Sequence, residues 1–197
     1  MTAEGMKIGV LALQGAFREH IQMIANCGCE AVEVRLPHQC GDLDGLIIPG
    51  GESTTISKLI DEYDMRDAIR SRAYSGKPIF GTCAGAILLA DRQNGKKRKF
   101  LNLIDIDITR NAYGRQIDSR ETDIRLAFST STPFHAVFIR APVITETGPG
   151  VTELSFYNGS VILARQDNIL VSTFHPELTC DDRIHRYFLE MARKGGS

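Results

Sequence analysis

The sequence predicts an α/β fold, a flavodoxin-like three-layer sandwich with a mostly parallel sheet and added antiparallel strands in the second half. In the first half, short apolar runs alternate with segments whose apolar residues recur at helical spacing, as in parallel strands covered by helices. In the second half, apolar and polar residues alternate one by one, which is typical of strands with one solvated face. The 197 residues contain no repeat, low-complexity tract or linker, so we expect residues 1–197 to form a single domain.

Strands and helices are expected to alternate through the first half. The strands are predicted over 8–13, 32–36, 46–48 and 79–80, and the helices over 17–28, 56–63, 65–73 and 86–90. Gly28 ends the first of these helices. The apolar face of that helix is expected to contain Phe17, Ile21, Ile24 and Ala25. This order favours an open sheet with helices on both faces.

The second half is expected to consist mainly of strands. They are predicted over 104–109, 124–128, 134–140, 143–145, 154–157, 161–164 and 169–174. Asn158–Gly159 is a strong hairpin signal between two of them. A last helix begins after Thr179, Asp181 and Asp182, because acidic groups favour a helix N-terminus. Its apolar face is expected to contain Ile184, Tyr187, Phe188 and Met191.

The composition is that of an ordinary soluble globular protein, with 43% hydrophobic and 24% charged residues. The 23 Lys and Arg nearly balance the 24 Asp and Glu, which argues against binding nucleic acid or a membrane surface through bulk electrostatics. The apolar runs fall short of the roughly 18–20 residues that span a bilayer. No cleavage pattern follows the N-terminal run, so we expect no signal peptide and a cytoplasmic protein. The basic run Lys96–Lys97–Arg98–Lys99 is expected to be a solvated loop, with a partner-facing or nucleic-acid patch as the alternative.

The cysteines do not predict a disulfide framework or a metal site. There are five, at positions 27, 29, 40, 83 and 180, an odd and scattered set. No C-x-x-C occurs, and Cys27 and Cys29 lack a nearby histidine that would complete a zinc site, so we expect no structural metal. Four of the cysteines are expected to be ordinary, mostly buried side chains, whereas the surroundings of Cys83 indicate chemistry.

Cys83 lies in Gly81–Thr82–Cys83–Ala84–Gly85, the G-x-nucleophile-x-G form of a nucleophile elbow with Cys in place of the usual Ser. A sharp strand-to-helix turn strains the central residue and requires small neighbours two positions away. The dipole of the following helix favours the thiolate, and the Ala84 N–H can bind an oxyanion. The alternative is a chance glycine-rich turn with a buried cysteine.

His175–Pro176–Glu177 follows the last predicted strand, at the sheet edge where open α/β folds place their sites. Residues two apart on an extended segment project to the same side. The carboxylate of Glu177 can therefore bond one imidazole nitrogen and leave the other to accept the proton of a thiol. Alone, the motif suggests a surface histidine before a turn; together with Cys83 it favours a catalytic triad.

The segment Pro49–Gly50–Gly51–Glu52–Ser53 follows the third predicted strand. Two glycines let backbone N–H groups face a ligand without interference from a Cβ atom, and Ser53 or Thr54 can cap the helix that follows. A phosphate site is the alternative, but neither G-K-[ST] nor G-x-G-x-x-G occurs. We therefore favour a second oxyanion donor or a clamp on the substrate backbone.

Together these three motifs resemble the triad (class I) glutamine amidotransferases. Further stretches are similar, more narrowly, to the glutaminase subunits of pyridoxal 5′-phosphate synthase. These stretches cover residues 11–16, 18–20, 50–55, 110–116, 138–142 and 174–179. The resemblance runs in order from about Lys7 to Met191, nearly the whole chain.

The resemblance implies a glutaminase that hydrolyses L-glutamine to glutamate and ammonia with no metal or organic cofactor. It also implies a partner, the (β/α)₈-barrel subunit of the synthase, which uses the ammonia to make pyridoxal 5′-phosphate. Cys83 would be the nucleophile with His175 and Glu177 as relay partners, and Gln14 matches a residue near the partner interface that orders the oxyanion strand. The amides of Gly51 and Ala84 would form the oxyanion hole. The implied glutamine-binding residues are Gly50, Gly51, Glu52, Ser53, Arg110, Ile139 and Arg140.

Other readings of the residues stay open. Arg110 and Arg140 each end a predicted strand, where a guanidinium can meet a carboxylate of the substrate or form a surface ion pair. The triad can also belong to an amidotransferase subunit of another pathway or to a γ-glutamyl hydrolase, although Gln14 and the 110–116 motif argue against both. A non-catalytic flavodoxin-like binding module with a structural Cys83 is the third possibility.

Overall fold

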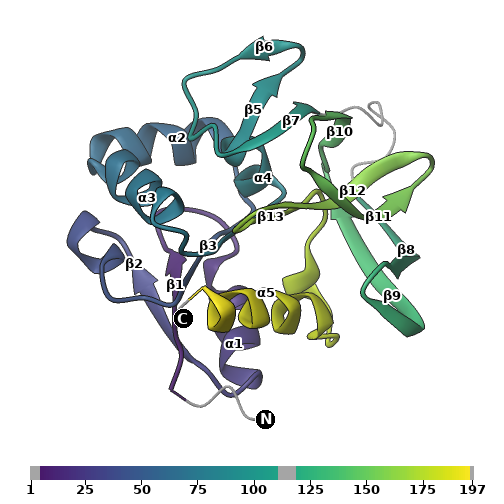
Figure 1. Ribbon diagram of the computed structural model, residues 1–197, viewed down its shortest axis with the longest axis horizontal. Coiled ribbons are helices and arrows are strands. Elements are labelled where there is room, and N and C mark those ends of the chain that lie inside the picture. Colours follow the sequence, from purple (N-terminus) through teal and green to yellow (C-terminus); the bar gives the residue numbers. More distant parts are fainter. Residues whose placement is uncertain (1–4, 111–118, 196–197) are drawn as a thin grey trace.

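A twisted sheet runs through the centre of the protein (Figure 1), whose computed structural model describes residues 5–110 and 119–195. Its parallel part contains, in spatial order, β2 (Glu30–Val34), β1 (Lys7–Leu11), β3 (Gly45–Ile48), β4 (Ile79–Thr82) and β13 (Ile169–Ser172). Taken along the chain, these strands have the order 2-1-3-4-5, which is that of flavodoxin-like folds. The predicted fold class is confirmed.

Antiparallel strands extend the sheet beyond β13. The next strands are β12 (Ser160–Gln166), β10 (Val143–Thr147), β7 (Ile104–Thr109), β5 (Ala90–Gln93) and β6 (Lys96–Lys97). Of these neighbours only β5 and β7 pair in parallel, and β11 (Thr152–Tyr157) pairs with β12 off the main path. A separate two-stranded sheet is formed by β8 (Ser119–Leu126) and β9 (Ser129–Ile139).

The hairpin predicted at Asn158–Gly159 is confirmed. Tyr157 and Ser160 are opposite each other in the β11–β12 pair, so two residues make the turn. Asn158 and Gly159 have φ values of 48° and 78°. Positive φ at both central residues is what a type I′ hairpin turn requires, and Asn-Gly meets that requirement with little strain.

Helices cover both faces of the sheet (Figure 1). One face carries α1 (Phe17–Asn26) and α5 (Arg183–Lys194), and the other carries α2 (Ser53–Glu62), α3 (Met65–Tyr74) and α4 (Ala84–Leu89). The described residues also form two short 3₁₀ turns, η1 (Pro37–Cys40) and η2 (Pro176–Leu178). Among the described residues, no helix combines the length and the apolar character needed to cross a membrane.

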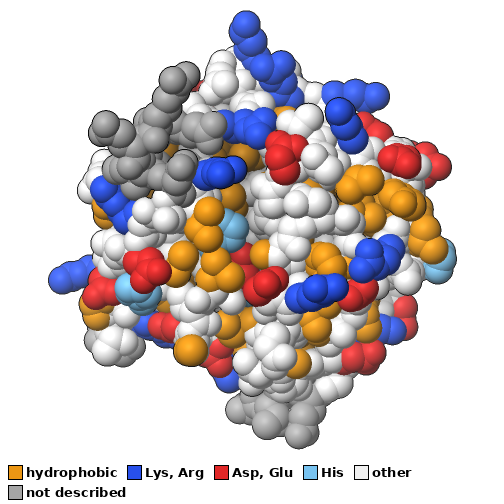
Figure 2. Space-filling model, turned by 180° about the vertical axis from the view of Figure 1, so that it is seen from behind, with side chains coloured by type: hydrophobic (Ala, Val, Ile, Leu, Met, Phe, Trp, Pro, Cys, Tyr) orange, Lys and Arg blue, Asp and Glu red, His pale blue; other side chains and the backbone are white. Residues whose placement is uncertain are grey.

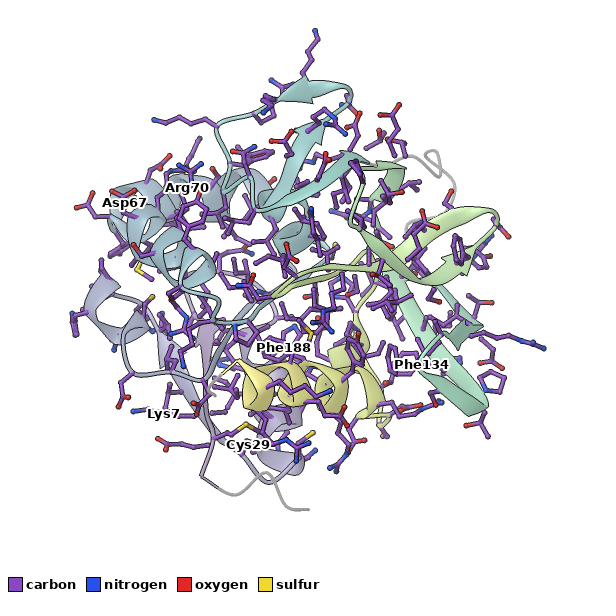
Figure 3. All side chains as sticks on the ribbon, in the orientation of Figure 1. Lys7, Cys29, Asp67, Arg70, Phe134 and Phe188 are labelled. Carbon is purple, nitrogen blue, oxygen red and sulfur yellow. The ribbon has the colours of Figure 1, made fainter. Side chains whose placement is uncertain are left out.

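Neighbouring residues of each central strand point into two different cores. Leu46 and Ile48 of β3 belong to the core under α2, α3 and α4, whereas Ile47 belongs to the core under α1 and α5. The second core also contains Phe188 of α5 and Phe134 of β9, which lie on the same side of the sheet in Figure 3. This alternation of sides produces three layers.

Several local predictions were wrong. Ala25 is exposed, because the buried face of α1 is formed by His20, Met23 and Ile24. The strand predicted to Leu36 ends at Val34, and Leu36 is exposed. Cys180 is exposed, whereas Cys27, Cys29 and Cys40 are buried as expected.

The prediction of a loop over 96–99 was wrong for Lys96–Lys97, which form strand β6 and pair with β5. The predicted helix 86–90 instead spans Ala84–Leu89, and Ala90 begins strand β5. The alternation of apolar and polar residues over 104–109 predicts that Asp107 is solvated, but it is buried, and its carboxylate accepts a hydrogen bond from the Gly95 N–H in the β5–β6 turn (2.7 Å). All four side chains of the basic run 96–99 are exposed, and Figure 2 shows Lys and Arg gathered at that end of the molecule. Lys97 pairs with Asp91 at 3.3 Å.

Candidate active site

Parallel strands bring the predicted site residues to one edge of the sheet. Gln14 follows β1, Gly50 follows β3, Cys83 follows β4 and His175 follows β13, each within three residues of the strand end. The pairs β1–β3, β3–β4 and β4–β13 are parallel and in register, so these strand ends are neighbours. Ligand sites of open α/β sheets lie at this carboxyl edge.

Cys83 occupies a strained turn between β4 and α4. Its backbone has φ 48° and ψ −101°, a conformation that L side chains rarely adopt, and its N–H donates to the Ser172 carbonyl at 2.8 Å. A Cβ on Gly85 would lie 2.0 Å from the Ile48 carbonyl oxygen, and one on Gly81 would lie 2.5 Å from a Leu89 methyl carbon. The two glycines of the motif therefore let the turn close.

His175 links Cys83 to Glu177. The imidazole Nδ1 lies 2.7 Å from Glu177 Oε1, and the ring also hydrogen-bonds to Cys83, which leaves Nε2 for the sulfur. Burial lowers the pKa of His175, but the bonds to Cys83 and Glu177 and the charge of Glu177 raise it to about 10. The imidazolium therefore lies between the cysteine and the carboxylate, in the order nucleophile, base and orienting acid that a catalytic triad requires.

Glu177 lies in the 3₁₀ turn η2, so the prediction of an extended segment from His175 to Glu177 was wrong. The turn still directs the carboxylate back to the imidazole, and the Glu177 side chain is fully buried. Burial raises the pKa of Glu177, whereas His20 and His175 lower it, and the net pKa lies below the usual value. Glu177 is therefore ionised at neutral pH.

The glycine segment after β3 packs directly against this pair. A Cβ on Gly50 would lie 2.4 Å from the His175 ring and 3.4 Å from the Cys83 Cβ. The Gly50 carbonyl accepts a hydrogen bond from the Ala16 N–H (3.0 Å), and the Gln14 side-chain oxygen accepts one from the Glu52 N–H (2.8 Å). The loop after β1 thus fixes the segment at two points.

Glu52, rather than Ser53 or Thr54, caps helix α2. Its carboxylate accepts hydrogen bonds from the N–H groups of Thr54 and Thr55 at 3.2 and 2.7 Å, while Ser53 is the buried first residue of the helix. Arg110 donates to the same carboxylate at 2.9 Å. The pKa of Glu52 is lowered to about 2, and the hydrogen bond from the Thr55 hydroxyl is the largest cause. Arg110 was predicted to meet either a carboxylate of the substrate or a surface carboxylate of the protein. In this structure it forms an ion pair with Glu52.

Ile139 and Arg140 lie at the end of β9, next to the cysteine. The Cys83 thiol donates a hydrogen bond of 3.9 Å to the Ile139 carbonyl, and Ala84 is buried as the first residue of α4. Arg140 is exposed with a φ of 44°. The rest of the 110–116 motif, after Arg110, lies outside the described residues.

Sequence reasoning missed a polar cluster behind the triad. His20 on α1 and His185 on α5 are fully buried, with His20 Nδ1 3.0 Å from His185 Nε2. His20 Nε2 lies 3.1 Å from the Thr82 hydroxyl and 3.4 Å from Glu177 Oε2. Helical spacing was the available signal, because Phe17, His20 and Ile24 fall on one face of α1. Across the described ranges, no three His, Cys, Asp or Glu side chains are grouped to hold a metal ion.

Known proteins are similar to this chain along nearly its whole length. The SNO glutamine amidotransferase family matches residues 10–194. Pyridoxal 5′-phosphate synthase subunit PdxT of Carboxydothermus hydrogenoformans is 52% identical over 190 residues, 96% of this chain and 100% of its own. The same subunit of Niallia circulans is 52% identical over 189 residues, 96% of this chain and 99% of its own.

Solved structures of other proteins have the same fold as this chain. A crystal structure of a glutamine amidotransferase superimposes with a TM-score of 0.89 at 48% identity and covers 94% of this chain and 98% of its own. The structure of PurLQS from Thermotoga maritima shares the fold, with a TM-score of 0.65 at 16% identity over 96% of this chain and 96% of its own. The chain belongs to the SNO glutamine amidotransferase family.

Proposed function

We propose that this protein hydrolyses L-glutamine to L-glutamate and ammonia, and that it does so as the glutaminase subunit of pyridoxal 5′-phosphate synthase in vitamin B6 biosynthesis. The observation that carries the proposal is the contact of Cys83, in its strained turn, with the His175–Glu177 pair. The PdxT relatives, about half of whose residues are identical to this chain over nearly its full length, support the pathway.

The proposed reaction uses the triad in two steps. The Cys83 thiolate attacks the side-chain amide carbon, and His175 donates its proton to the departing nitrogen, so that ammonia leaves and a γ-glutamyl thioester forms. Water then attacks the thioester carbon while His175 removes its proton, so that the carbon–sulfur bond breaks, glutamate is released, and the Cys83 thiolate and the His175 imidazolium are restored. Glu177 orients the imidazole and stabilises its charged form.

We assign the oxyanion hole to the backbone N–H groups of Gly51 and Ala84. Ala84 is the first residue of α4, directly after the nucleophile. The Gly50 carbonyl points to Ala16, so the N–H of Gly51 in the same trans peptide points the opposite way. The glutamine-binding residues are proposed to be Gly50, Gly51, Glu52, Ser53, Arg110, Ile139 and Arg140.

The chemistry of ammonia supports a synthase partner. Free ammonia is mostly protonated at neutral pH, and ammonium is no nucleophile, so a glutaminase that feeds a synthesis benefits from covered delivery. We propose the barrel subunit of the synthase as that partner, with Gln14 near the interface, where its bond to the Glu52 N–H orders the glycine segment. We further propose that residues 1–197 act as one glutaminase domain in the cytoplasm.

Glutamate release from glutamine tests the proposal, measured for the chain alone and with the barrel component of a pyridoxal 5′-phosphate synthase. Cys83→Ala is expected to abolish the activity, whereas Cys180→Ala, which changes an exposed cysteine, is the matched control. Activity that is lost only in Cys83→Ala and that rises with the barrel subunit supports the site and the pathway. Activity that does not change when the barrel subunit is added would support the triad, but it would indicate another amidotransferase pathway or a γ-glutamyl hydrolase. No activity in a bound complex would contradict the proposal.

A further inference from the structure

Two histidines that the proposed reaction does not use lie directly behind the triad. His20 comes from α1 and His185 from α5, and both are 0% exposed. Their rings share a hydrogen bond of 3.0 Å between His20 Nδ1 and His185 Nε2. Buried imidazoles that contact each other and a catalytic carboxylate are costly to keep in a core unless the polar groups satisfy one another.

The contacts of Glu177 fix which nitrogen of His20 carries the proton. Glu177 Oε1 is occupied by His175, and among the described residues Oε2 has no hydrogen-bond partner at normal distance. His20 Nε2 is 3.4 Å away from that oxygen. A buried carboxylate oxygen facing the lone pair of an imidazole would be repelled, so His20 presents an Nε2–H to it.

This tautomer orders the rest of the cluster. With its proton on Nε2, His20 has a lone pair on Nδ1, and it must accept the Nε2–H of His185. His185 Nδ1 is then an unprotonated ring nitrogen, in agreement with its lack of a partner among the described residues. Burial lowers the pKa of both rings, that of His185 to about 3, so each carries one proton at neutral pH.

His20 also reaches the glycine segment. Its Nε2 lies 3.1 Å from the hydroxyl oxygen of Thr82, and the same oxygen accepts a hydrogen bond from the Gly50 N–H at 3.0 Å. Gly50 packs against the His175 ring on its other side. The single Nε2–H of His20 therefore lies between the carboxylate that orients His175 and the hydroxyl that anchors Gly50.

We propose that His20 is a positioning residue of the glutaminase site, whose Nε2–H holds the Glu177 carboxylate and the Thr82 hydroxyl in place, and that His185 fixes the required tautomer. The proposal rests on the proposed function, because His20 would align the His175–Glu177 pair, which acts on the nucleophile, and the glycine segment, which carries the proposed oxyanion hole. Its consequence is that the relay and the glycine segment are aligned together by one hydrogen-bond donor.

Two amide substitutions at position 20 separate this role from core packing. The side-chain nitrogen of His20→Gln can stand near the position of Nε2, whereas that of His20→Asn reaches only the position of Nδ1. Both variants are neutral and polar, so they share the cost of a polar group in this core. Phe188→Leu is the matched control, because it removes volume from the same buried layer on α5 without touching the relay.

Each variant is measured in three ways. The first is kcat and KM for glutamine with the barrel subunit, and the second is the urea midpoint of unfolding. The third is the rate at which iodoacetamide alkylates Cys83 at different pH values, followed by peptide mass spectrometry. We expect His20→Asn to lower kcat by about 10- to 100-fold and to move the alkylation profile to higher pH, because Glu177 is no longer held against His175. His20→Gln is expected to stay within about threefold of the parent, and Phe188→Leu to shift only the urea midpoint.

The outcomes distinguish the proposal from its alternatives. Equal loss of kcat in His20→Gln and His20→Asn, or the same loss in Phe188→Leu, would overturn it in favour of a packing role. A parental alkylation profile in His20→Asn would also overturn it. If the parent shows no glutaminase activity with any partner, the proposed function fails. The pH dependence of Cys83 alkylation then still tests whether His20 positions Glu177 against His175.

Discussion

Gly81 and Gly85 face each other across the turn that holds Cys83. A Cβ on Gly81 would lie 2.7 Å from the carbonyl carbon of Gly85, and one on Gly85 would lie 2.0 Å from the Ile48 carbonyl oxygen. These obstacles are backbone atoms, so no side-chain rotation relieves them. The close approach of β3, β4 and α4 that places the nucleophile at the sheet edge therefore requires glycine at both positions.

Gly85→Ala should destabilise the protein strongly. The added methyl group must displace the Ile48 carbonyl, and overpacking of this kind costs about 1–3 kcal/mol in the free energy of unfolding. Urea denaturation followed by circular dichroism measures the loss. Gly41→Ala is the control, because its φ is −66° and the nearest atom to its added Cβ is 3.7 Å away. Equal urea midpoints for the two variants would contradict the close approach.

The local features of the site are those that could be predicted from the sequence. The elbow is specified by five consecutive residues, and the hairpin turn by Asn158–Gly159 alone, so neither depends on a distant partner. The position of the site followed from parallel strand order, which also needs only local patterns. The cap of α2 was assigned to Ser53 or Thr54 because these residue types are preferred there, whereas Glu52 accepts both N–H groups.

Features that depend on distant contacts were not predictable in the same way. His20 hydrogen-bonds to His185, 165 residues away, and to Thr82, 62 residues away, and neither distance leaves a mark on a local pattern. Strand β5 has the sequence ADRQ, which neither alternates nor is apolar, and it is a strand because it pairs with β7. Tertiary contacts override the weak local preference at such positions.

Gln14→Ala should weaken glutamine binding more than it slows catalysis. The substitution removes the acceptor of the Glu52 N–H, which is one of the two hydrogen bonds that hold the glycine segment to the loop after β1. Loss of one hydrogen bond of this kind predicts a rise in KM of about tenfold, with a smaller change in kcat. Steady-state kinetics with the barrel subunit measure both constants. Gln22→Ala is the control, because Gln22 is exposed on α1 and bonds only to Asn26 among the described residues. A parental KM in Gln14→Ala would refute this role.

Glu52→Ala should destabilise the protein at neutral pH and not at low pH. Glu52 caps α2 as a carboxylate, and its pKa is lowered to about 2 from an ordinary value of 4.5. The stabilisation is therefore fully present above pH 4.5 and is lost as the pH falls through about 2. Loss of an N-cap costs about 1 kcal/mol in the free energy of unfolding, and solvent screening of this exposed group limits the contribution of Arg110.

Urea denaturation of Glu52→Ala and the parent across this pH range tests the prediction. The difference in unfolding free energy should shrink as the pH falls below 4.5. Lys58→Ala, at an exposed position on the same helix, should show a difference that does not vary across this range. A difference between Glu52→Ala and the parent that stays constant down to pH 2 would show that the carboxylate charge does not stabilise the helix.

His175 should remain an imidazolium well above neutral pH. Its pKa is raised to about 10 from an ordinary value of 6.5, although burial opposes this, because Cys83 and Glu177 both favour the charged ring. Nitrogen-15 NMR of the histidine side chains, recorded as a pH titration, should give a midpoint near that value. Cys83→Ala and Glu177→Gln should each lower the midpoint by removing one hydrogen-bond partner, whereas Cys180→Ala should leave it unchanged.

The same shift makes a prediction for stability. A group whose pKa is higher in the folded than in the unfolded protein stabilises the fold below its unfolded pKa and loses that effect as the pH rises through its folded pKa. For His175 the stabilisation should be complete below pH 6.5 and be lost toward pH 10, and Glu177→Gln should reduce it at neutral pH, as should Cys83→Ala. A midpoint near 6.5 in the NMR titration of His175 in the parent protein would contradict both predictions, because the ring would then be neutral in the resting site at pH values above 6.5. The proton would then be on the Cys83 sulfur, and His175 would have to remove it during the attack on glutamine rather than before it.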